Sequence, residues 1–476
     1  MIPAVSEPIL CRVHIRPVSG DIALLSLGRI ISRQVQPAIL GGNLSVENFS
    51  LFCACPVDCF EFCDDSHPLE QLQTALAKYR LENAASSSNS IPLPGWIGYF
   101  SYDLGRYLEC LPSHAKDDLR MPIIHLAFYD AIIVYNHNTG QAHLAALEYT
   151  GQKESVQQKF ARLEQWIAQS QELILELPPR LPRTNKPELA FQTNMTQANY
   201  MHSLERIGRH ILDGDVYQIN FSQRFECPFQ ADAATLFLWQ NTYNPSPYAA
   251  YLSTNERAIV SASPELFLQI RGQDILTRPI KGTRPRRMCE CGQDAVEFNR
   301  RQYEELLSSE KDKAELMMIT DLQRNDLARI CIPGTRHVRH PRKIEAYPTV
   351  FHAYSEVAGT LPRANDPKLF CDILRATFPG GSITGAPKIR AMQLIEELEP
   401  IRRGVYTGCI GHIGINFDAT LNIAIRSIVV QDGRVYAQTG GGIVADSDPQ
   451  AEWDETLVKA GALLDCIRAV SHNGTC

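Results

Sequence analysis

The segment TLNIAIRSIVVQDGRVYAQTG, residues 420–440, contains two apolar runs on either side of the turn sequence QDG. A short glycine-containing turn between β-branched runs indicates a β-hairpin. The segment AIVSASPELFLQIRGQDILTRPIKG, residues 258–282, repeats this pattern around RGQD, and VYQINFSQRF, residues 216–225, alternates as a further strand. Because hairpins outnumber β-α-β alternations, the sequence predicts an α+β fold, a large sandwich of mainly antiparallel sheets flanked by helices.

Helices and a linker surround these strands. TQANYMHSLERIGRHILDG, residues 196–214, begins with a threonine suited to an N-cap and ends at glycine, and a second helix is predicted over about 154–175. Between them, PPRLPRTNKPE at 178–188 interrupts the periodicity with prolines and charges. We therefore expect an N-terminal region over 1–177, a linker over 178–188 and a C-terminal region over 189–476.

The composition limits the classes of function. The chain has 476 residues, 44% hydrophobic and 21% charged, as in a globular enzyme with a sizeable core. A formal net charge of -7 gives no basic field for nucleic acid or anionic membranes. The N-terminus lacks the pattern of an export signal, and no window reaches the roughly 18 apolar residues of a membrane span. We expect a cytoplasmic enzyme without nucleic-acid or membrane partners.

Fourteen cysteines are dispersed along the chain, and only Cys53, Cys55, Cys59 and Cys63 form a dense group. Their spacing, C-x-C-x₃-C-x₃-C, differs from the paired C-x₂₋₄-C units of most zinc sites. Buried structural thiols are therefore favoured over a metal site.

Two predicted helices carry pairs of acidic residues. Asp312 and Glu315 are three residues apart in one, and Glu452 and Glu455 are three apart in the other. Residues at this spacing share a helix face. If the two faces meet, they supply the hard oxygen ligands that Mg²⁺ prefers. Either helix taken alone is more typical of ordinary solvated acids than of a metal site.

Two glycine-rich loops resemble nucleotide sites but depart from them. FPGGSITGAPK at 378–388 has Ala386 and Pro387 where a P-loop needs lysine and a hydroxyl residue. QTGGGIVADSD at 438–448 contains G-x-G-x-x-A, but the aspartates that follow would repel a pyrophosphate. Both loops offer backbone N–H groups that can cradle a carboxylate, and Lys388 adds a cation.

Eight motifs follow one another along the chain: GDVYQINFSQRF, SASPELF, RPIKGTRPR, AELMMITDLQRNDL, GGSITGAPKIRAMQLIEELEP, YTGCIGHI, NIAIRS and TGGGIVADSDPQAEWDE. Their identity and order resemble the chorismate-utilising enzymes, over about 190–470. The resemblance implies the sandwich fold of anthranilate synthase component I, with the N-terminal region packed closely against a chorismate-binding catalytic domain.

The resemblance implies a Mg²⁺ site in the catalytic domain. Glu315 and Glu455 match the metal ligands of the family, and Asp312 and Glu452 match neighbouring acids that support the ion through water. In the family the ion binds the ring carboxylate of chorismate and polarises the ring as a Lewis acid.

Other matches predict how the substrate is held. The implied substrate-binding residues are Thr283, Gly385, Lys388, Tyr406, Arg426, Gly441 and Gly442. The glycines and the lysine would hold carboxylates, and Tyr406 and Arg426 match positions that clamp the enolpyruvyl side. An arginine fork suits a carboxylate better than a lysine does. For each glycine, a tight turn is the alternative.

Two residues match catalytic positions of the family. Glu265 resembles the general acid that protonates the departing C4 hydroxyl, and burial would raise its pKa enough to hold the proton. His352, in FHAYSEV, matches the histidine of the site, with a structural core histidine as the alternative.

Two further positions separate the reactions of the family. Gln218 stands where isochorismate and salicylate synthases have a lysine that activates water, and an amide cannot serve as that base. Lys281 stands where anthranilate synthases have alanine, and it offers a nucleophile for attack at C2, which directs ammonia to C4. The residues thus favour amination at C4, and amination at C2 is the alternative.

The resemblance also implies partners. No segment resembles a glutaminase, so the ammonia is expected from a separate glutamine amidotransferase subunit. Family members can bind tryptophan in the N-terminal half; here LLSLG at 24–28 loosely resembles one motif and NPSPY at 244–248 is close to the other. Tryptophan is therefore a further candidate ligand. A non-catalytic binding subunit is disfavoured because the motif acids and Lys281 are intact.

Overall fold

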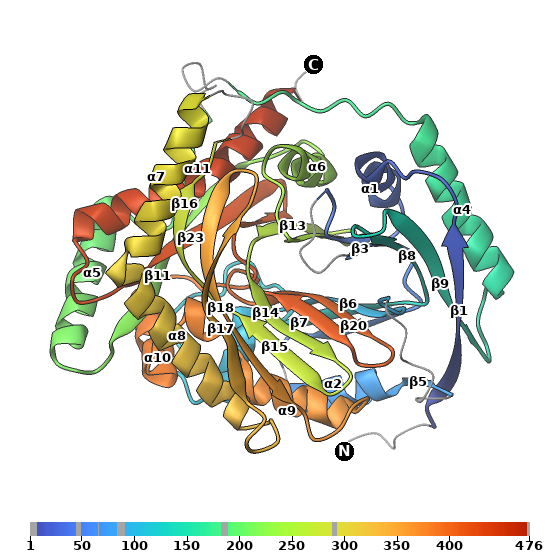
Figure 1. Ribbon diagram of the computed structural model, residues 1–476, viewed down its shortest axis with the longest axis horizontal. Helices are drawn as coiled ribbons and strands as arrows, with labels where there is room; N and C mark the ends of the chain where they lie inside the picture. The colour runs from blue at the N-terminus through green and yellow to red at the C-terminus, as the bar shows by residue number, and fades with distance from the viewer. Residues whose placement is uncertain are drawn as a thin grey trace.

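Two large β-sheets pack face to face in the computed structural model of the protein (Figure 1). The structure describes residues 7–43, 49–64, 66–82, 91–181, 189–287 and 293–473. In both sheets nearly all neighbouring strands run antiparallel; β1 and β5 are parallel. The predicted α+β sandwich of mainly antiparallel sheets is confirmed.

Sheet A contains, in spatial order, β10 (Gln192–Thr193), β11 (Gln218–Pro228), β23 (Arg434–Ile443), β22 (Ser427–Gln431), β13 (Arg257–Ser263), β12 (Tyr248–Ser253), β2 (Ala38–Leu40), β3 (Phe49–Cys53), β8 (Ala131–Asn136), β9 (Gln141–Tyr149), β1 (Ile9–Val18) and β5 (Tyr79–Leu81), with β19 (Gly385–Ala386) paired to β11. Sheet B contains β16 (Ile280–Pro285), β18 (Val350–Thr360), β15 (Asp274–Arg278), β14 (Leu266–Arg271), β21 (Ala419–Asn422), β20 (Cys409–Gly414), β6 (Gly95–Phe100), β7 (Ile124–Tyr129) and β4 (Asp58–Phe62), with β17 (His337–Ala346) paired to β18.

Helices cover the outer faces of both sheets (Figure 1). Sheet A packs against α1 (Leu24–Ser32), α4 (Val156–Glu172), α6 (Ala233–Tyr243) and α11 (Pro449–Asn473). Sheet B packs against α2 (Pro68–Ala77) and α9 (Pro367–Thr377). The β11 edge packs against α5 (Gln197–Leu212) and α10 (Lys388–Leu398), and the β16 edge against α7 (Gln293–Ser308) and α8 (Glu310–Ala328).

The chain passes from one sheet to the other within two runs that the sequence presents as continuous strands. The run 258–270 divides into β13 of sheet A and β14 of sheet B, and the run 420–430 divides into β21 of sheet B and β22 of sheet A. The expectation of single strands here is wrong. Pro264, at the first crossing, lacks the N–H that a strand interior needs, and Arg426, at the second, has a φ of 51°.

Strands from both sides of 178–188 contribute to each sheet. β2 pairs with β12 in sheet A, and β6 pairs with β20 in sheet B. Hydrogen-bonded ladders therefore tie the N-terminal residues to the C-terminal ones. Residues 182–188 lie outside the described part of the chain, so the linker and the division into 1–177 and 189–476 stay predictions.

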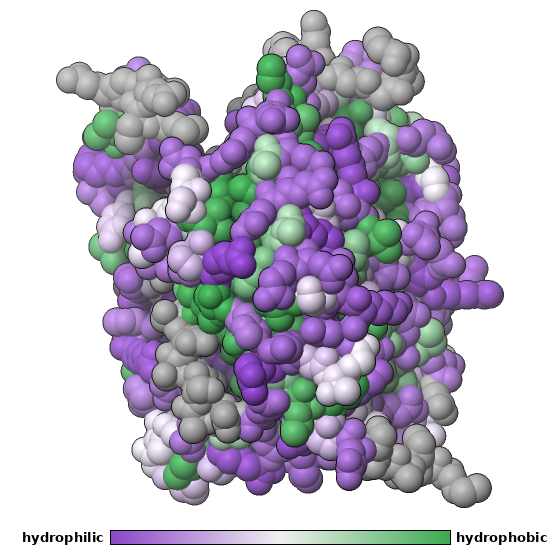
Figure 2. Space-filling view, turned by 90° about the vertical axis from the view of Figure 1, so that its right-hand side faces the viewer, coloured by the Kyte–Doolittle hydropathy of each residue, from purple (hydrophilic) through white to green (hydrophobic). Residues whose placement is uncertain are grey.

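The surface formed by α4 and β1 is mainly hydrophilic, and hydrophilic residues interrupt its hydrophobic ones (Figure 2). Within the described residues, no helix has both the length and the apolar character of a membrane span.

The expectation of buried thiols is correct for only part of the cysteine group. Cys53 is buried, Cys55 is half-buried, and Cys59 and Cys63 are exposed. Cys59 is exposed because β4 is the edge strand of sheet B, so no neighbouring strand covers one side of it.

Candidate active site

The two crossing segments between the sheets carry two of the predicted site residues, Glu265 and Arg426. The Ile423 amide donates to the Glu265 carbonyl at 3.0 Å, and the Ala262 amide donates to the Arg426 carbonyl at 3.0 Å. Backbone hydrogen bonds therefore connect the two crossing segments to each other. Residues that leave one sheet and enter the next are fixed at both ends, which suits a precise site.

Glu265 is 4% exposed, and its Oε1 lies 3.5 Å from the Ile280 amide. Burial raises the pKa of its carboxyl to about 7, although Ser382, the Ile280 amide and the charge of Lys281 oppose the shift. A carboxyl with this pKa is about half protonated at neutral pH. It can therefore deliver a proton.

Lys281 lies on β16, where its amine comes close to sheet A. A Cβ added at Gly442 would lie 3.0 Å from Lys281 Nζ and 2.9 Å from Gln218 Nε2. Gly442 is directly opposite Asn220 in the ladder between β11 and β23. The three elements β11, β16 and β23 thus meet at a position where only glycine leaves the amine and the amide room.

Gln218, the first residue of β11, is fully buried, yet within the described part of the chain neither atom of its side-chain amide has a hydrogen-bond partner. An unpaired buried polar group costs about 1–3 kcal/mol. An unpaired buried amide needs a partner, which a bound ligand or an ordered water can supply. Gln218 is therefore a candidate contact for a polar ligand.

The predicted acidic faces of α8 and α11 both approach Lys281. Glu315 of α8 lies 3.7 Å from Lys281 Nζ and 4.0 Å from Lys311 Nζ. Burial alone would raise the pKa of Glu455 of α11, but the charges of Lys459, Lys311 and Lys281 together hold it below its usual value. One acid from each helix therefore interacts electrostatically with the same two lysines, Lys281 and Lys311.

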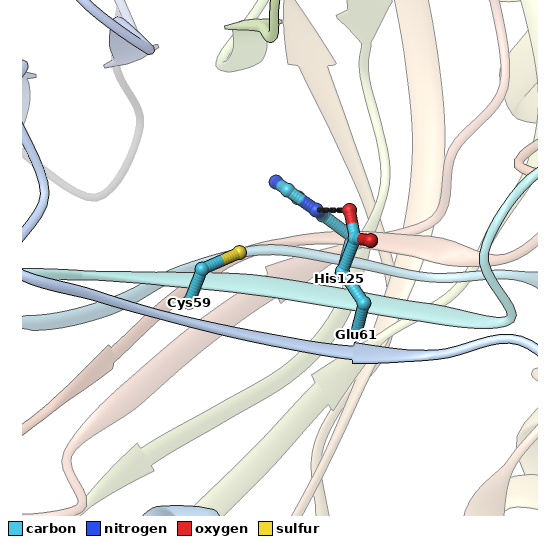
Figure 3. A group of neighbouring side chains, drawn as sticks. All are labelled: Cys59, Glu61 and His125. Atoms are coloured by element: carbon cyan, nitrogen blue, oxygen red, sulfur yellow. Dashed lines mark hydrogen bonds and ion pairs between the residues drawn. The ribbon is translucent and has the colours of Figure 1, made fainter.

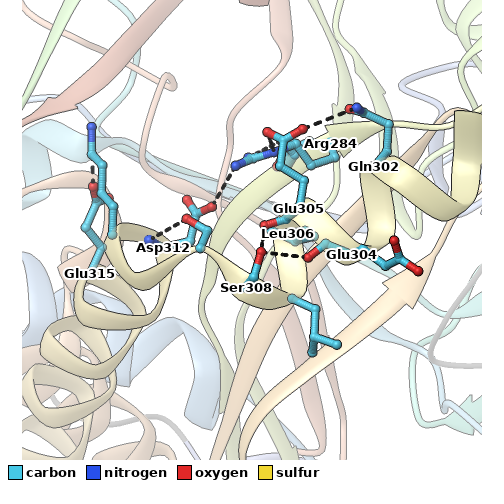
Figure 4. Close-up of polar contacts among 12 residues, drawn as sticks. Arg284, Gln302, Glu304, Glu305, Leu306, Ser308, Asp312 and Glu315 are labelled. Atoms are coloured by element: carbon cyan, nitrogen blue, oxygen red, sulfur yellow. Dashed lines mark hydrogen bonds and ion pairs between the residues drawn. The ribbon is translucent and has the colours of Figure 1, made fainter.

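The other two predicted acids lie on the same helices: Asp312 three residues before Glu315 on α8, and Glu452 three residues before Glu455 on α11. Glu452 accepts a hydrogen bond from Ser447 at 2.6 Å, and its pKa is raised by burial. A Cβ added at Gly441 would lie 3.0 Å from Glu452 Oε2. Asp312 pairs with Arg284 at 3.1 Å, and Figure 4 shows Asp312 and Glu315 on the same helix.

The four carboxylates match the donor set of a hard cation such as Mg²⁺. Their oxygens are not gathered as tightly as around an ion: in the described ranges, no three of these acids offer atoms within 4.8 Å of one another. Lysines contact Glu315 instead. The residue types fit the cation.

His352 and Thr283 form a pair on β18 and β16. Thr283 Oγ1 and His352 Nδ1 share a hydrogen bond of 2.8 Å. Burial, with a smaller contribution from the charge of Arg426, lowers the pKa of His352 well below its usual range. His352 is therefore a neutral imidazole. Its Nε2 has no partner within the described part of the chain.

Of the remaining predicted substrate-binding residues, Tyr406 and Gly385 lie beside β11, whereas Lys388 does not point toward Lys281 and Gln218. Tyr406 is buried next to Asn220. Gly385 lies beside β11, where an added Cβ would lie 2.1 Å from the Gln218 carbonyl. Lys388 is not directed at this group; its Nζ pairs with Asp326 at 2.6 Å.

Sequence reasoning missed the lysines that neutralise the acids. Lys311 lies four residues before Glu315, and Lys459 lies four residues after Glu455 and pairs with it at 2.7 Å. Their i,i+4 spacing was the available signal, because residues at this spacing are neighbours on a helix.

The NPSPY segment contributes to a separate cavity between the sheets, lined among others by Gly41, Pro247, Tyr248, His412 and Asn422. The LLSLG segment forms most of the first turns of α1 and contributes no lining residue there. Tryptophan as a ligand of this half stays a prediction.

Comparison with known proteins identifies the family. Residues 52–465 match the family model described as chorismate binding enzyme. The chain is 39% identical to aminodeoxychorismate synthase component 1 of Bacillus subtilis over 372 residues, which are 78% of this chain and 76% of that protein. It is 35% identical to anthranilate synthase component 1 of Aquifex aeolicus over 382 residues, 80% of this chain and 75% of the relative.

Solved structures show the same architecture. Anthranilate synthase component I from Streptococcus pneumoniae matches with a TM-score of 0.73 and 28% identity, over 87% of this chain and 92% of that one. The menaquinone-specific isochorismate synthase of Escherichia coli shares the fold with a TM-score of 0.71 at 19% identity, over 98% of this chain and 96% of that one. On this sequence match, supported by the shared fold, the chain belongs to the chorismate binding enzyme family.

Proposed function

We propose that the protein aminates chorismate at C4 with ammonia and releases 4-amino-4-deoxychorismate. The observation that carries this proposal is the meeting of Lys281 Nζ and the unpaired Gln218 amide at Gly442. A nucleophilic amine beside a non-basic amide suits amination and disfavours the activation of water. The names of relatives such as the Bacillus subtilis protein support the same choice.

In the first step, a covalent bond forms between Lys281 and the substrate, and the C4–O bond of the substrate breaks. Lys281 Nζ attacks C2 of chorismate, the ring double bond shifts, and the C4 hydroxyl leaves as water with a proton from Glu265. Ammonia then attacks C4, the double bond shifts back, and the C2–N bond breaks to return the lysine amine. The sum is exchange of the C4 hydroxyl for an amino group, with release of one water.

Glu315 and Glu455, supported by Asp312 and Glu452, would hold Mg²⁺ at the junction of α8 and α11. When bound, the ion supplies Lewis-acid polarisation of the ring carboxylate and charge neutralisation. The guanidinium of Arg426 and the hydroxyl of Tyr406 would hold the enolpyruvyl side. An arginine fork can bind a carboxylate through two parallel hydrogen bonds.

The ammonia would come from a separate glutamine amidotransferase subunit. The term "component 1" in the names of the relatives is consistent with a partner chain. Amination at C2, leading to anthranilate, is the second candidate function, and the name of the Aquifex aeolicus relative favours it.

Product analysis separates these candidates. Purified chain with chorismate, Mg²⁺ and an ammonium salt is expected to form 4-amino-4-deoxychorismate, detected by liquid chromatography and mass spectrometry, and no fluorescent anthranilate. A reaction without Mg²⁺ is the control. Anthranilate as the main product would contradict the C4 assignment, and the absence of any aminated product would contradict both functions.

The raised pKa of Glu265 predicts a pH dependence. The acid form donates the proton, so kcat at saturating free ammonia should fall as the pH rises through about 7. Glu265→Gln should lower kcat on the order of 10²–10⁴-fold and remove the fall. Rates must be expressed per neutral ammonia, because its fraction increases with pH.

The matched control is Glu256→Gln, since Glu256 is an exposed acid on the turn before β13. It should reproduce the parent profile. If Glu265→Gln keeps the same fall with pH, the titrating group lies elsewhere and Glu265 is not the acid.

A further inference from the structure

A second cluster of metal-ligating side chains lies at the opposite end of sheet B from Lys281. Cys59 and Glu61 are two residues apart on the edge strand β4, so they point to the same face. His125 of β7 is directly opposite Glu61 in the ladder. Their ligand atoms, one from each residue, all lie within 4.8 Å of one another, and no other such group occurs within the described ranges.

The hydrogen bond between Glu61 and His125 decides which imidazole nitrogen is available. His125 Nδ1 lies 2.8 Å from Glu61 Oε1. An ionised carboxylate only accepts hydrogen bonds, so Nδ1 carries the proton and donates. In the neutral ring, Nε2 then has a free lone pair. Figure 3 shows this second nitrogen on the same side of the sheet as Cys59 Sγ.

The surroundings hold the imidazole but leave the thiol open. The His125 side chain is 10% exposed and its ring stacks on Tyr99 with centroids 5.7 Å apart. Cys59 is exposed and forms no disulfide. The charge of Arg257 reaches Glu61, but Arg257 is itself paired with Glu256 at 3.0 Å. The Cys59 thiol is therefore open to a ligand from solvent, and the largely buried imidazole of His125 lies beside it.

We propose that Cys59 Sγ and His125 Nε2 bind a divalent cation of the zinc class, with Glu61 holding the imidazole through Nδ1. Thiolate and imidazole are preferred ligands of Zn²⁺, and a carboxylate behind the histidine is its usual support. A tetrahedral ion separates two such ligand atoms by roughly 3.5 Å, compared with at most 4.8 Å between Cys59 Sγ and a ring nitrogen of His125. On binding, the thiol proton passes to solvent and water fills the remaining positions.

The neighbouring Cys63 provides a matched control. It is also exposed and four residues after Cys59, which places the two Cα atoms about 13 Å apart along an extended chain. That distance is too long for one ion. Cys63→Ser should therefore leave the site intact.

The test is titration of the full chain with Co²⁺, a spectroscopic substitute for Zn²⁺, in a large excess of Mg²⁺ that saturates carboxylate-only sites. The parent should bind one Co²⁺ with a thiolate-to-cobalt charge-transfer band that Zn²⁺ abolishes. Cys59→Ser should lose the band, Glu61→Gln should weaken binding roughly 10–100-fold, and Cys63→Ser should match the parent. A band that is absent from the parent, survives in Cys59→Ser or disappears in Cys63→Ser would overturn the proposal.

Discussion

Replacing Lys281 with alanine is expected to reduce C4 amination roughly a thousandfold or more, because the variant loses the nucleophile that makes C4 reactive. The fold should remain, since within the described ranges the Lys281 side chain makes one loose ion pair, with Glu315 at 3.7 Å. Direct attack of ammonia would then be free to occur at C2. The remaining product should therefore shift toward the C2-aminated compound.

The nucleophilic role of Lys281 can be measured directly by detecting its covalent adduct with the substrate. Chorismate and Mg²⁺ without ammonia should leave the substrate attached to the peptide RPIKGTR, detected by peptide mass spectrometry after rapid denaturation. Lys281→Ala should show no adduct. The control is Lys313→Ala, because the Lys313 side chain on α8 is 42% exposed and pairs only with Glu310 among the described residues. Undiminished 4-amination by Lys281→Ala would refute the nucleophilic role.

The sequence predicts the class of fold well because antiparallel hairpins are local. The pair β22 and β23, which Asp432 and Gly433 join, follows directly from the run around QDG. The passage of 258–270 from one sheet to the other could not be predicted in the same way. This passage depends on pairing with strands that are distant in the sequence. The hydrophobic periodicity of a segment does not show which strand it pairs with.

Some site residues could be found and others could not. The acids of α8 and α11 follow from helix spacing and from the family motifs, and the structure brings both helices to Lys281. Lys388 shows the limit of motif reasoning, since its partner Asp326 lies 62 residues away and no local pattern predicts the pair. The unpaired amide of Gln218 is likewise visible only when its neighbours are placed.

The exposed cysteines show the same limit. The spacing of cysteines can reveal only metal sites whose ligands are cysteines. The group that contains Cys59 has two other ligand types, Glu61 on the same strand and His125 on a different strand. A mixed ligand set built across two strands leaves no regular spacing in the sequence. Exposure at the sheet edge, not the interval between cysteines, separates Cys59 from the buried Cys53.

Glu455→Gln is expected to keep the fold and to lose Mg²⁺-dependent turnover by at least about 10²-fold. The substitution preserves volume but removes one hard anionic donor, and a neutral amide binds Mg²⁺ poorly. The side chain is 52% exposed and its ion pair is with Lys459 on the same helix, so its removal should change the free energy of unfolding by less than about 1 kcal/mol.

Initial rates across a series of Mg²⁺ concentrations separate weaker binding from slower chemistry. If Glu455 ligates the ion, Glu455→Gln should need much more Mg²⁺ for half-maximal rate, whereas Asp454→Asn should follow the parent curve. Asp454 is the neighbouring acid, is exposed and accepts a hydrogen bond from Gln450 at 3.0 Å, so it tests the effect of one lost charge at the same place on α11. A Glu455→Gln rate within about twofold of the parent at every Mg²⁺ concentration would show that α11 does not hold the ion, because loss of a direct ligand changes the affinity far more than that.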